Sequence, residues 1–157
     1  SPVNYNLDYN ITRREMLKVM MNLSGKEVID RCLWAFSDVG ASDWGCKYAE
    51  AAILEWYIAT NDTFRPDDNI TQIEALKMIM QAIWMQRDDN DDWRAGYVSK
   101  ASREKLIDDD YLEYNKSAVR WWIFSNVARS YDDFDYVESE VEIDPEIEEL
   151  FNSLFDL

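Results

Sequence analysis

Two short segments decide how this chain folds: Asn10-Ile11-Thr12-Arg13-Arg14-Glu15 and Asn69-Ile70-Thr71-Gln72-Ile73-Glu74. In each, a Thr stands three residues before a Glu, which is the pattern of a capping box. The Thr hydroxyl accepts from the Glu N–H, and the Glu side chain reaches back to the Thr N–H. An apolar helical run follows each segment, so the pattern predicts helix starts at Thr12 and Thr71.

A third, weaker copy reads Asn115-Lys116-Ser117-Ala118-Val119-Arg120. Ser117 can cap a helix, but Arg120 stands where the other copies have Glu. A cation in the first turn opposes the helix dipole unless it is paired. The runs 72–86 and 118–129 are apolar on nearly every side, which is typical of helices buried inside a domain. We expect the three capped helices to form a central bundle.

Another repeated pattern precedes the second and third helix starts. The same aromatic and aliphatic residue types recur at matching offsets after Trp44 and Trp93. After Trp44, an apolar stripe at helical spacing predicts an amphipathic outer helix; its members are Ala49, Ala52, Ile53, Trp56 and Tyr57. Pro66, with its Asp and Asn neighbours, predicts a turn before the inner helix.

The composition is that of a folded domain, with 157 residues of which 47% are hydrophobic. The formal net charge of −16 disfavours binding to nucleic acid and to anionic membranes. The chain has no histidine, which excludes His-based catalysis and His-ligated metal sites. No apolar stretch is long enough to span a membrane. We therefore predict no enzymatic activity, no cofactor, no metal site and no membrane insertion.

The two cysteines leave two alternatives. Cys32 and Cys46 are 14 residues apart. We favour two buried free thiols, because free Cys behaves as a small apolar residue. A disulfide is the alternative in an extracellular protein.

The acidic clusters at 88–92 and 108–110 raise the question of calcium. Neither has the Gly and Glu positions of the twelve-residue calcium loop. We interpret both as solvated turns and helix starts.

Residues 36–85 resemble an S-layer homology repeat. The landmarks of such a repeat occur here in the family's order: Phe36-Ser37-Asp38-Val39, Trp44, Phe64-Arg65-Pro66 and Ile70-Thr71-Gln72-Ile73-Glu74. Residues 5–24 resemble the second half of a repeat, and residues 92–130 resemble a degenerate one. In the family's T-R-A-E motif the arginine is a typical ligand contact. Arg13 stands at that position, whereas we align Gln72 and Ala118 with it in the other copies.

The resemblance implies an all-α domain with three repeats around a pseudo-threefold axis, a central three-helix bundle and outer amphipathic helices. It also implies a non-catalytic module, outside the cell at the surface or wall, that binds anionic cell-wall polysaccharide and anchors a protein to the bacterial envelope. The alternative is a protein–protein assembly module of a surface layer, which keeps the fold but has lost carbohydrate binding and takes another surface protein as its partner. The oligomeric state is left open.

Three units would complete such a domain. Residues 1–30 plus 131–157 form one split repeat, 36–87 form the second and 92–130 form the third. In the tail, Asp144-Pro145-Glu146 predicts a helix start, and an apolar stripe follows: Ile147, Leu150, Phe151, Leu154 and Phe155. We predict that this tail supplies the missing front half of the first repeat and so joins the two ends of the chain in a closed circle of three repeats. A peripheral helix or a partner-binding tail is the alternative.

Six residues are candidate ligand contacts: Arg13, Arg14, Asp38, Trp44, Arg65 and Trp93. The guanidinium of Arg13 suits a carboxylate, with a local salt bridge as the alternative role. We expect Arg14 to be the more exposed of the two arginines.

The remaining candidates have structural alternatives. Trp44 and Trp93 could stack on a sugar or pack between units, and Asp38 could line a groove or cap a turn. Trp121 and Trp122, on the apolar inner helix, are predicted core residues. A locally positive groove beside Arg13 would favour the anchoring function over the assembly function.

Overall fold

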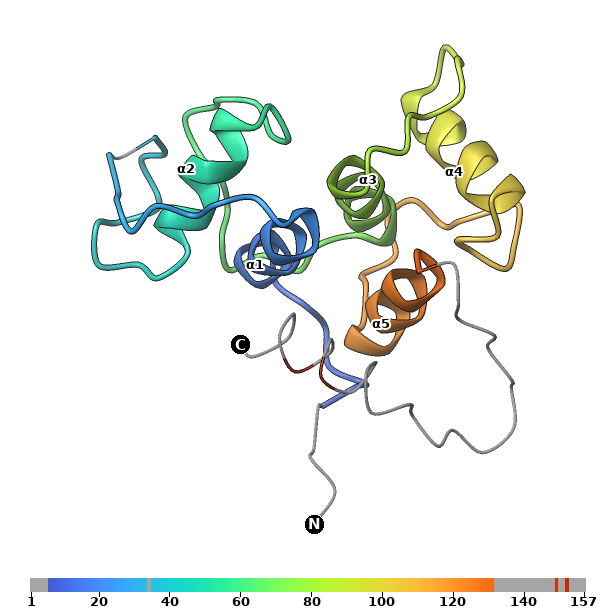
Figure 1. Ribbon diagram of the computed structural model, residues 1–157, viewed down its shortest axis with the longest axis horizontal. Coiled ribbons are helices and arrows are strands. Elements are labelled where there is room, and N and C mark those ends of the chain that lie inside the picture. The colour runs from blue at the N-terminus through green and yellow to red at the C-terminus, as the bar shows by residue number, and fades with distance from the viewer. Residues whose placement is uncertain (1–5, 34, 132–148, 150–151, 153–157) are drawn as a thin grey trace.

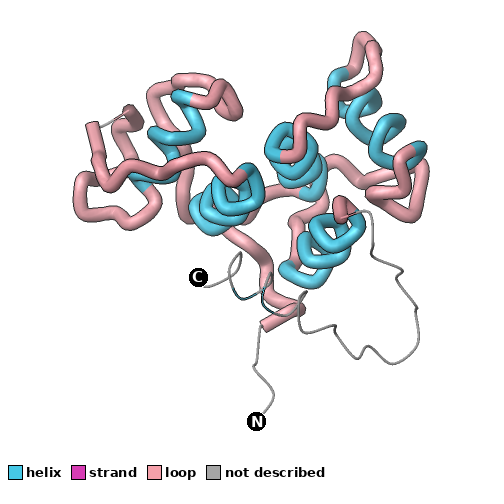
Figure 2. Tube along the Cα trace, in the orientation of Figure 1, coloured by secondary structure: helices cyan, strands magenta, loops and turns pink. Residues whose placement is uncertain are grey.

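The computed structural model describes residues 6–33, 35–131, 149 and 152 (Figure 1). These residues form an all-α fold, as predicted, with isolated β-bridges but no strand among them (Figure 2). The helices are α1 (Arg13–Ser24), α2 (Cys46–Leu54), α3 (Gln72–Ala82), α4 (Trp93–Arg103) and α5 (Arg120–Arg129).

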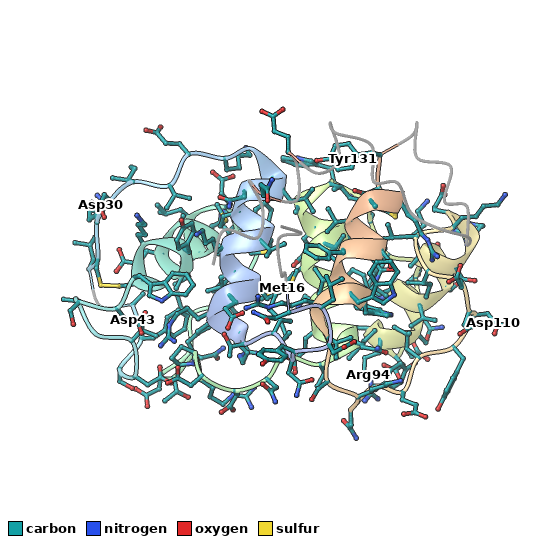
Figure 3. The ribbon with its side chains drawn as sticks, turned by 90° about the horizontal axis from the view of Figure 1, so that it is seen from below. Met16, Asp30, Asp43, Arg94, Asp110 and Tyr131 are labelled. Atoms are coloured by element: carbon teal, nitrogen blue, oxygen red, sulfur yellow. A yellow bond between two sulfur atoms is a disulfide. The ribbon has the colours of Figure 1, made fainter. Side chains whose placement is uncertain are left out.

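Helices α1, α3 and α5 lie side by side, and α2 and α4 lie outside them (Figure 1). Each of these outer helices packs on the inner helix that precedes it in the chain, α2 on α1 and α4 on α3. Met16 lies in the middle of the bundle (Figure 3) and is fully buried, as are Leu76, Ile79 and Ile123. The predicted central bundle and outer helices are therefore present in the described part of the chain.

A closed ring of three backbone hydrogen bonds joins the segments that enter the inner helices. The Ile11 N–H donates to the Ala118 carbonyl at 3.1 Å, the Ala118 N–H to the Ile70 carbonyl at 2.9 Å, and the Ile70 N–H to the Ile11 carbonyl at 3.0 Å. All three residues are fully buried. The ring gives these residues equivalent places, one before each inner helix.

The ring corrects the predicted start of the third inner helix. Because Ala118 matches Ile11 and Ile70, α5 begins two residues later than the sequence pattern predicts. Its N-cap is Val119, so Ser117 does not cap it. Arg120, and not Ala118, therefore stands at the position of Arg13. The similarity of Asn115-Lys116-Ser117 to the two Asn-Ile-Thr segments suggested the wrong alignment. Burial of Ala118 in the ring fixes where α5 begins.

The two predicted capping boxes are confirmed on the Thr side. The hydroxyl of Thr12 accepts from the N–H of Glu15, and the hydroxyl of Thr71 accepts from the N–H of Glu74, each at 3.3 Å. Val119 has the same extended backbone as both threonines but no side-chain cap. The first turn of α5 therefore lacks a hydrogen bond that α1 and α3 have.

Two predictions about tryptophans are wrong. Helix α2 ends at Leu54, so Trp56 is not part of its buried stripe and is exposed instead. Its backbone has a positive φ, which turns the side chain away from the helix. Trp121 is also exposed, whereas Trp122 packs against the core as predicted.

The cysteines form a disulfide between Cys32 and Cys46, so the prediction of two free thiols is wrong (Figure 3). The bond ties the loop after α1 to the first residue of α2. The chain folds this loop back over α2, which brings the two cysteines together; their spacing alone did not show this.

The predictions for the tail concern residues that lie largely outside the described part of the chain. Glu149 and Asn152, which are described, are both helical. Two statements about the repeats stay predictions. One is that the tail completes the circle of three repeats, and the other is that residues 1–30 and 131–157 form one split repeat. The pseudo-threefold arrangement of three complete repeats also stays a prediction.

Two isosteric substitutions, one that removes an N-cap and one that adds an N-cap, test the stabilising role of these caps. Thr71→Val removes an existing cap and should lower the free energy of unfolding by about 1 kcal/mol. Val119→Thr should raise it by about 0.5 kcal/mol, because the backbone at Val119 is already extended as an N-cap requires. Urea unfolding measures both changes. The two changes should have opposite signs, and destabilisation by Val119→Thr would contradict the cap assignment.

Candidate ligand-binding groove

A groove of about 280 Å³ opens beside Arg13. One wall is the loop after α2, including Tyr57 and Arg65. The other wall is α3, which contributes Lys77, and Trp93 at the start of α4 stands at the groove as well. Elements that are distant in the sequence therefore form one site.

The groove is positive although the chain is strongly acidic. Among the described residues that line it, the cations are Arg13, Arg65 and Lys77, and the only acid is Glu74. The chain as a whole has a net charge of −16. An anion is attracted to this groove and repelled by most of the remaining surface.

Arg13 is held in place by three contacts. Its Nε donates to the Phe64 carbonyl at 2.9 Å, its Nη1 pairs with the Glu74 carboxylate, and its guanidinium lies 4.9 Å from the centroid of the Phe64 ring. Its side chain is 16% exposed. Burial lowers the pKa of Arg13, and the charge of Glu74 opposes that shift. Arg13 therefore fixes the groove wall as well as contributing positive charge.

The same ion pair recurs once more in the bundle. Arg120, at the first position of α5, pairs with Glu15 of α1 at 3.0 Å. In both cases the first residue of an inner helix binds the capping-box Glu of another inner helix. The Glu15 carboxylate therefore offsets the unfavourable interaction between the Arg120 charge and the dipole of α5. Gln72 and Trp122 occupy the third set of positions and cannot form the pair.

Lys77 and Trp93 form the part of the groove best suited to a sugar. The Lys77 ammonium lies 5.3 Å from the centroid of the Trp93 indole. Trp93 is partly exposed and packs edge-on against Tyr97. An indole face can stack on a sugar ring while an ammonium binds a carboxylate. Arg65 adds a second exposed cation, loosely paired with Asp68 at 3.5 Å.

A second hollow, of about 300 Å³, repeats this pairing on α1. The Lys18 ammonium lies 5.9 Å from the Trp44 centroid. Lys18 and Lys77 each follow their capping Thr by six residues. That offset is the sequence signal that could have found both lysines, which were missed as candidates.

Arg14 lies beside Trp44 of this second hollow, with its guanidinium 5.7 Å from the Trp44 centroid. The guanidinium donates to Asp43 at 2.6 Å and to Asp67 at 2.7 Å. The Arg14 side chain is 18% exposed and that of Arg13 is 16% exposed, so Arg14 is the more exposed of the two, as predicted, by a small margin. Arg14 is nevertheless mostly buried, because two carboxylates from separate loops enclose it.

A third hollow, also of about 300 Å³, lies between α5 and the loop after α4. Ser125 occupies the place of Lys18 and Lys77, six residues after the N-cap Val119. Among the described lining residues, Asp108 and Asp109 outnumber the one cation, Arg129. This hollow does not attract anions.

Asp38 lies behind the turn that carries Arg65. Its carboxylate accepts from the N–H groups of Phe64 at 2.8 Å and Arg65 at 2.7 Å. Partial burial raises the pKa of Asp38, but these two donors and the charge of Arg13 together lower it by more. The pKa therefore lies below its usual value, and Asp38 positions the groove wall as a turn cap does.

The six candidates thus fall into three places. Arg13, Arg65 and Trp93 line the positive groove. Trp44 lines the second hollow, and Arg14 lies beside Trp44. Asp38 supports the turn between them. Ligand contact by any of these six stays a prediction.

Comparison with known proteins agrees with this architecture. Residues 35–76 match the family model of the S-layer homology domain. This match supports an S-layer-homology-type domain in that part of the chain. The chain is also 27% identical over 125 residues to the middle cell wall protein of Brevibacillus brevis, covering 76% of this chain and 12% of that protein. The S-layer homology match and this similarity indicate the cell surface or cell wall as its location. In the described part of the chain, no helix has the length and apolar character needed to cross a membrane.

The lowered pKa of Asp38 gives a test of its role in the turn that carries Arg65. A depressed carboxyl pKa contributes stability above the unfolded-state pKa of about 3.9, and this contribution is lost as the pH falls through the folded-state pKa. Asp38→Asn keeps one acceptor oxygen of the two. The wild type should therefore be the more stable protein from pH 7 to about pH 5.

Unfolding by urea across this pH range measures the difference. The gap between wild type and Asp38→Asn should narrow below about pH 4. A gap that does not change with pH would show that the charge of Asp38 does not hold the turn.

Proposed function

We propose that this S-layer homology domain anchors its protein by binding anionic cell-wall polysaccharide in the groove of Arg13, Arg65 and Lys77, without catalysis. The observation that carries the proposal is the positive charge of this groove in a chain of net charge −16. A carboxylate-bearing sugar matches the cations, and the Trp93 indole supplies a stacking face.

The three hollows differ in their side chains and charges, which supports binding of a specific ligand over unspecific adhesion to the cell wall. The first combines an indole with three cations, the second repeats the Lys–Trp pair, and the third has Ser125 and two aspartates. A polymer that bound by shape alone would not favour one hollow over another. We therefore expect the groove at Lys77 to contribute most of the affinity.

The experiment is co-sedimentation with purified bacterial cell-wall sacculi, with sacculi stripped of their secondary polymer as a control. Lys77→Gln and Arg65→Gln each remove a charge from the groove without breaking the ion pair of Arg13 and Glu74. Each should weaken binding about tenfold, as expected for loss of one hydrogen bond to a charged group.

Lys105→Gln is the matched control. It removes one charge from an exposed lysine at the end of α4 and should leave binding unchanged. Equal weakening by Lys105→Gln would mean that only net charge matters. Wild-type protein that stays in solution with intact sacculi would favour the assembly function, in which the arginines serve only to join helices as Arg120 joins Glu15.

A further inference from the structure

Two tryptophans stand at backbone positions that favour glycine. At the end of α2 the N–H of Trp56 donates to the Ile53 carbonyl at 3.0 Å, and the next N–H closes the turn onto Ala52. Trp84 occupies the same place after α3. Their φ values are +60° and +62°. Glycine is preferred here because a β-carbon is disfavoured at positive φ, and α1 ends with Gly25 in this conformation.

Neither tryptophan contributes its ring to the core. Trp56 is 90% exposed and Trp84 is 73% exposed. The residues that follow them, Tyr57 and Met85, fill the apolar position of the same motif. Backbone preference and packing would both be satisfied by glycine, so the fold does not explain two large indoles at these positions.

Lys26 links the two segments that carry these tryptophans. The Lys26 ammonium lies 3.3 Å from the carboxylate of Glu55, the neighbour of Trp56. The same ammonium lies 5.4 Å from the centroid of Trp84. Lys26 therefore connects the end of α2 to the end of α3, and it places hydrogen-bonding groups beside the indoles.

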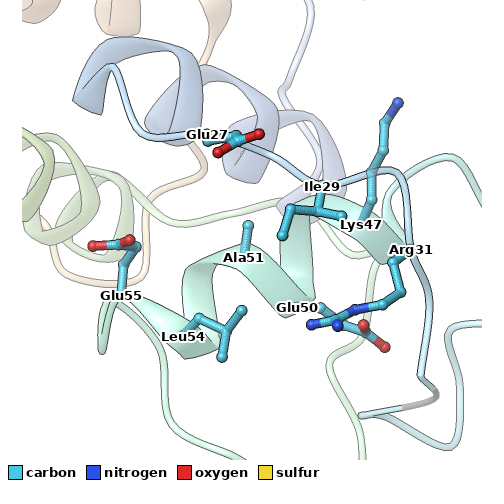
Figure 4. A pocket seen from close by; sticks show the side chains of 8 residues that line it. All are labelled: Glu27, Ile29, Arg31, Lys47, Glu50, Ala51, Leu54 and Glu55. Carbon is cyan, nitrogen blue, oxygen red and sulfur yellow. The ribbon is translucent and has the colours of Figure 1, made fainter.

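A shallow hollow of about 190 Å³ continues this surface over α2 (Figure 4). Ile29 on the loop and Leu54 at the helix end are both exposed and line it. Among the described residues, its lining has the cations Arg31 and Lys47 and the acids Glu27, Glu50 and Glu55. Lys26 and Asp30 pair with Glu55 and Lys47 at its edge and offset each other. The hollow therefore has no excess of cations, whereas the lining of the groove does, so the two surfaces suit ligands of different charge.

We propose that Trp56 and Trp84 form a second binding surface, for an uncharged glycan strand. The apolar C–H faces of sugar rings stack on exposed indoles, and their hydroxyls bond to charged side chains such as Lys26 and Glu55. A neutral ligand suits a surface without an excess of cations and avoids the repulsion that the acidic chain exerts on anions. This surface is separate from the groove and does not depend on it.

The test measures binding of the neutral oligosaccharide N-acetylchitohexaose by calorimetry. Trp56→Gly and Trp84→Gly should each weaken binding about tenfold. Neither should lower the melting temperature, because glycine suits the positive φ. Lys105→Gly is the matched control, since Lys105 has the same backbone conformation after α4, with φ +60°. It should leave binding unchanged.

Lys77→Gln separates this proposal from the groove, because it should reduce sedimentation with sacculi but leave binding of the neutral oligosaccharide intact. The proposal is overturned if wild type does not bind N-acetylchitohexaose, or if the two glycine variants bind it as well as wild type does. It is also overturned if sedimentation shows that wild type self-associates and that the glycine variants are monomeric. The surface would then be an interface between copies of the chain.

Discussion

The ring of hydrogen bonds among Ile11, Ala118 and Ile70 is the constraint on which the rest of the structure depends. Buried backbone N–H and C=O groups need partners, and here each of three entering segments supplies one donor and one acceptor to its neighbours. The ring sets where each inner helix begins. It thereby brings the first residue of one helix beside the capping-box Glu of another, as seen for Arg13 with Glu74 and Arg120 with Glu15.

A repeated scaffold of this kind separates folding from recognition. The backbone places equivalent positions beside three hollows, but the side chains at those positions differ. Lys18 and Lys77 face an indole, whereas Ser125 and two aspartates stand in the third hollow. The scaffold therefore tolerates replacement of the lysine in one unit, because the ring and the apolar helices hold that unit in place without it.

The exposed tryptophans differ in how they relate to the stability of the fold. Trp44 and Trp93 sit against neighbouring side chains at the hollows and serve packing as well as any ligand. Trp56 and Trp84 occupy positive-φ positions and bury little, so they oppose the local backbone preference. Charge also differs between the two surfaces, with an excess of cations in the lining of the groove and none in the hollow over α2.

Features that depend on near neighbours could be predicted from the sequence: the capping boxes at Thr12 and Thr71, the apolar inner helices, the outer helices and the resemblance of residues 36–85 to one family. Arg13, Arg65 and Trp93 were also among the predicted candidates, and the structure brings these three together. The start of α5 instead depends on tertiary packing, because burial of Ala118 in the ring outweighs the local cap signal of Ser117. Packing between distant loops likewise decided the disulfide, the enclosure of Arg14 by Asp43 and Asp67, and the exposure of Trp56. The positive groove forms only when Lys77 of α3 meets Arg13 and Arg65, which no local pattern specifies.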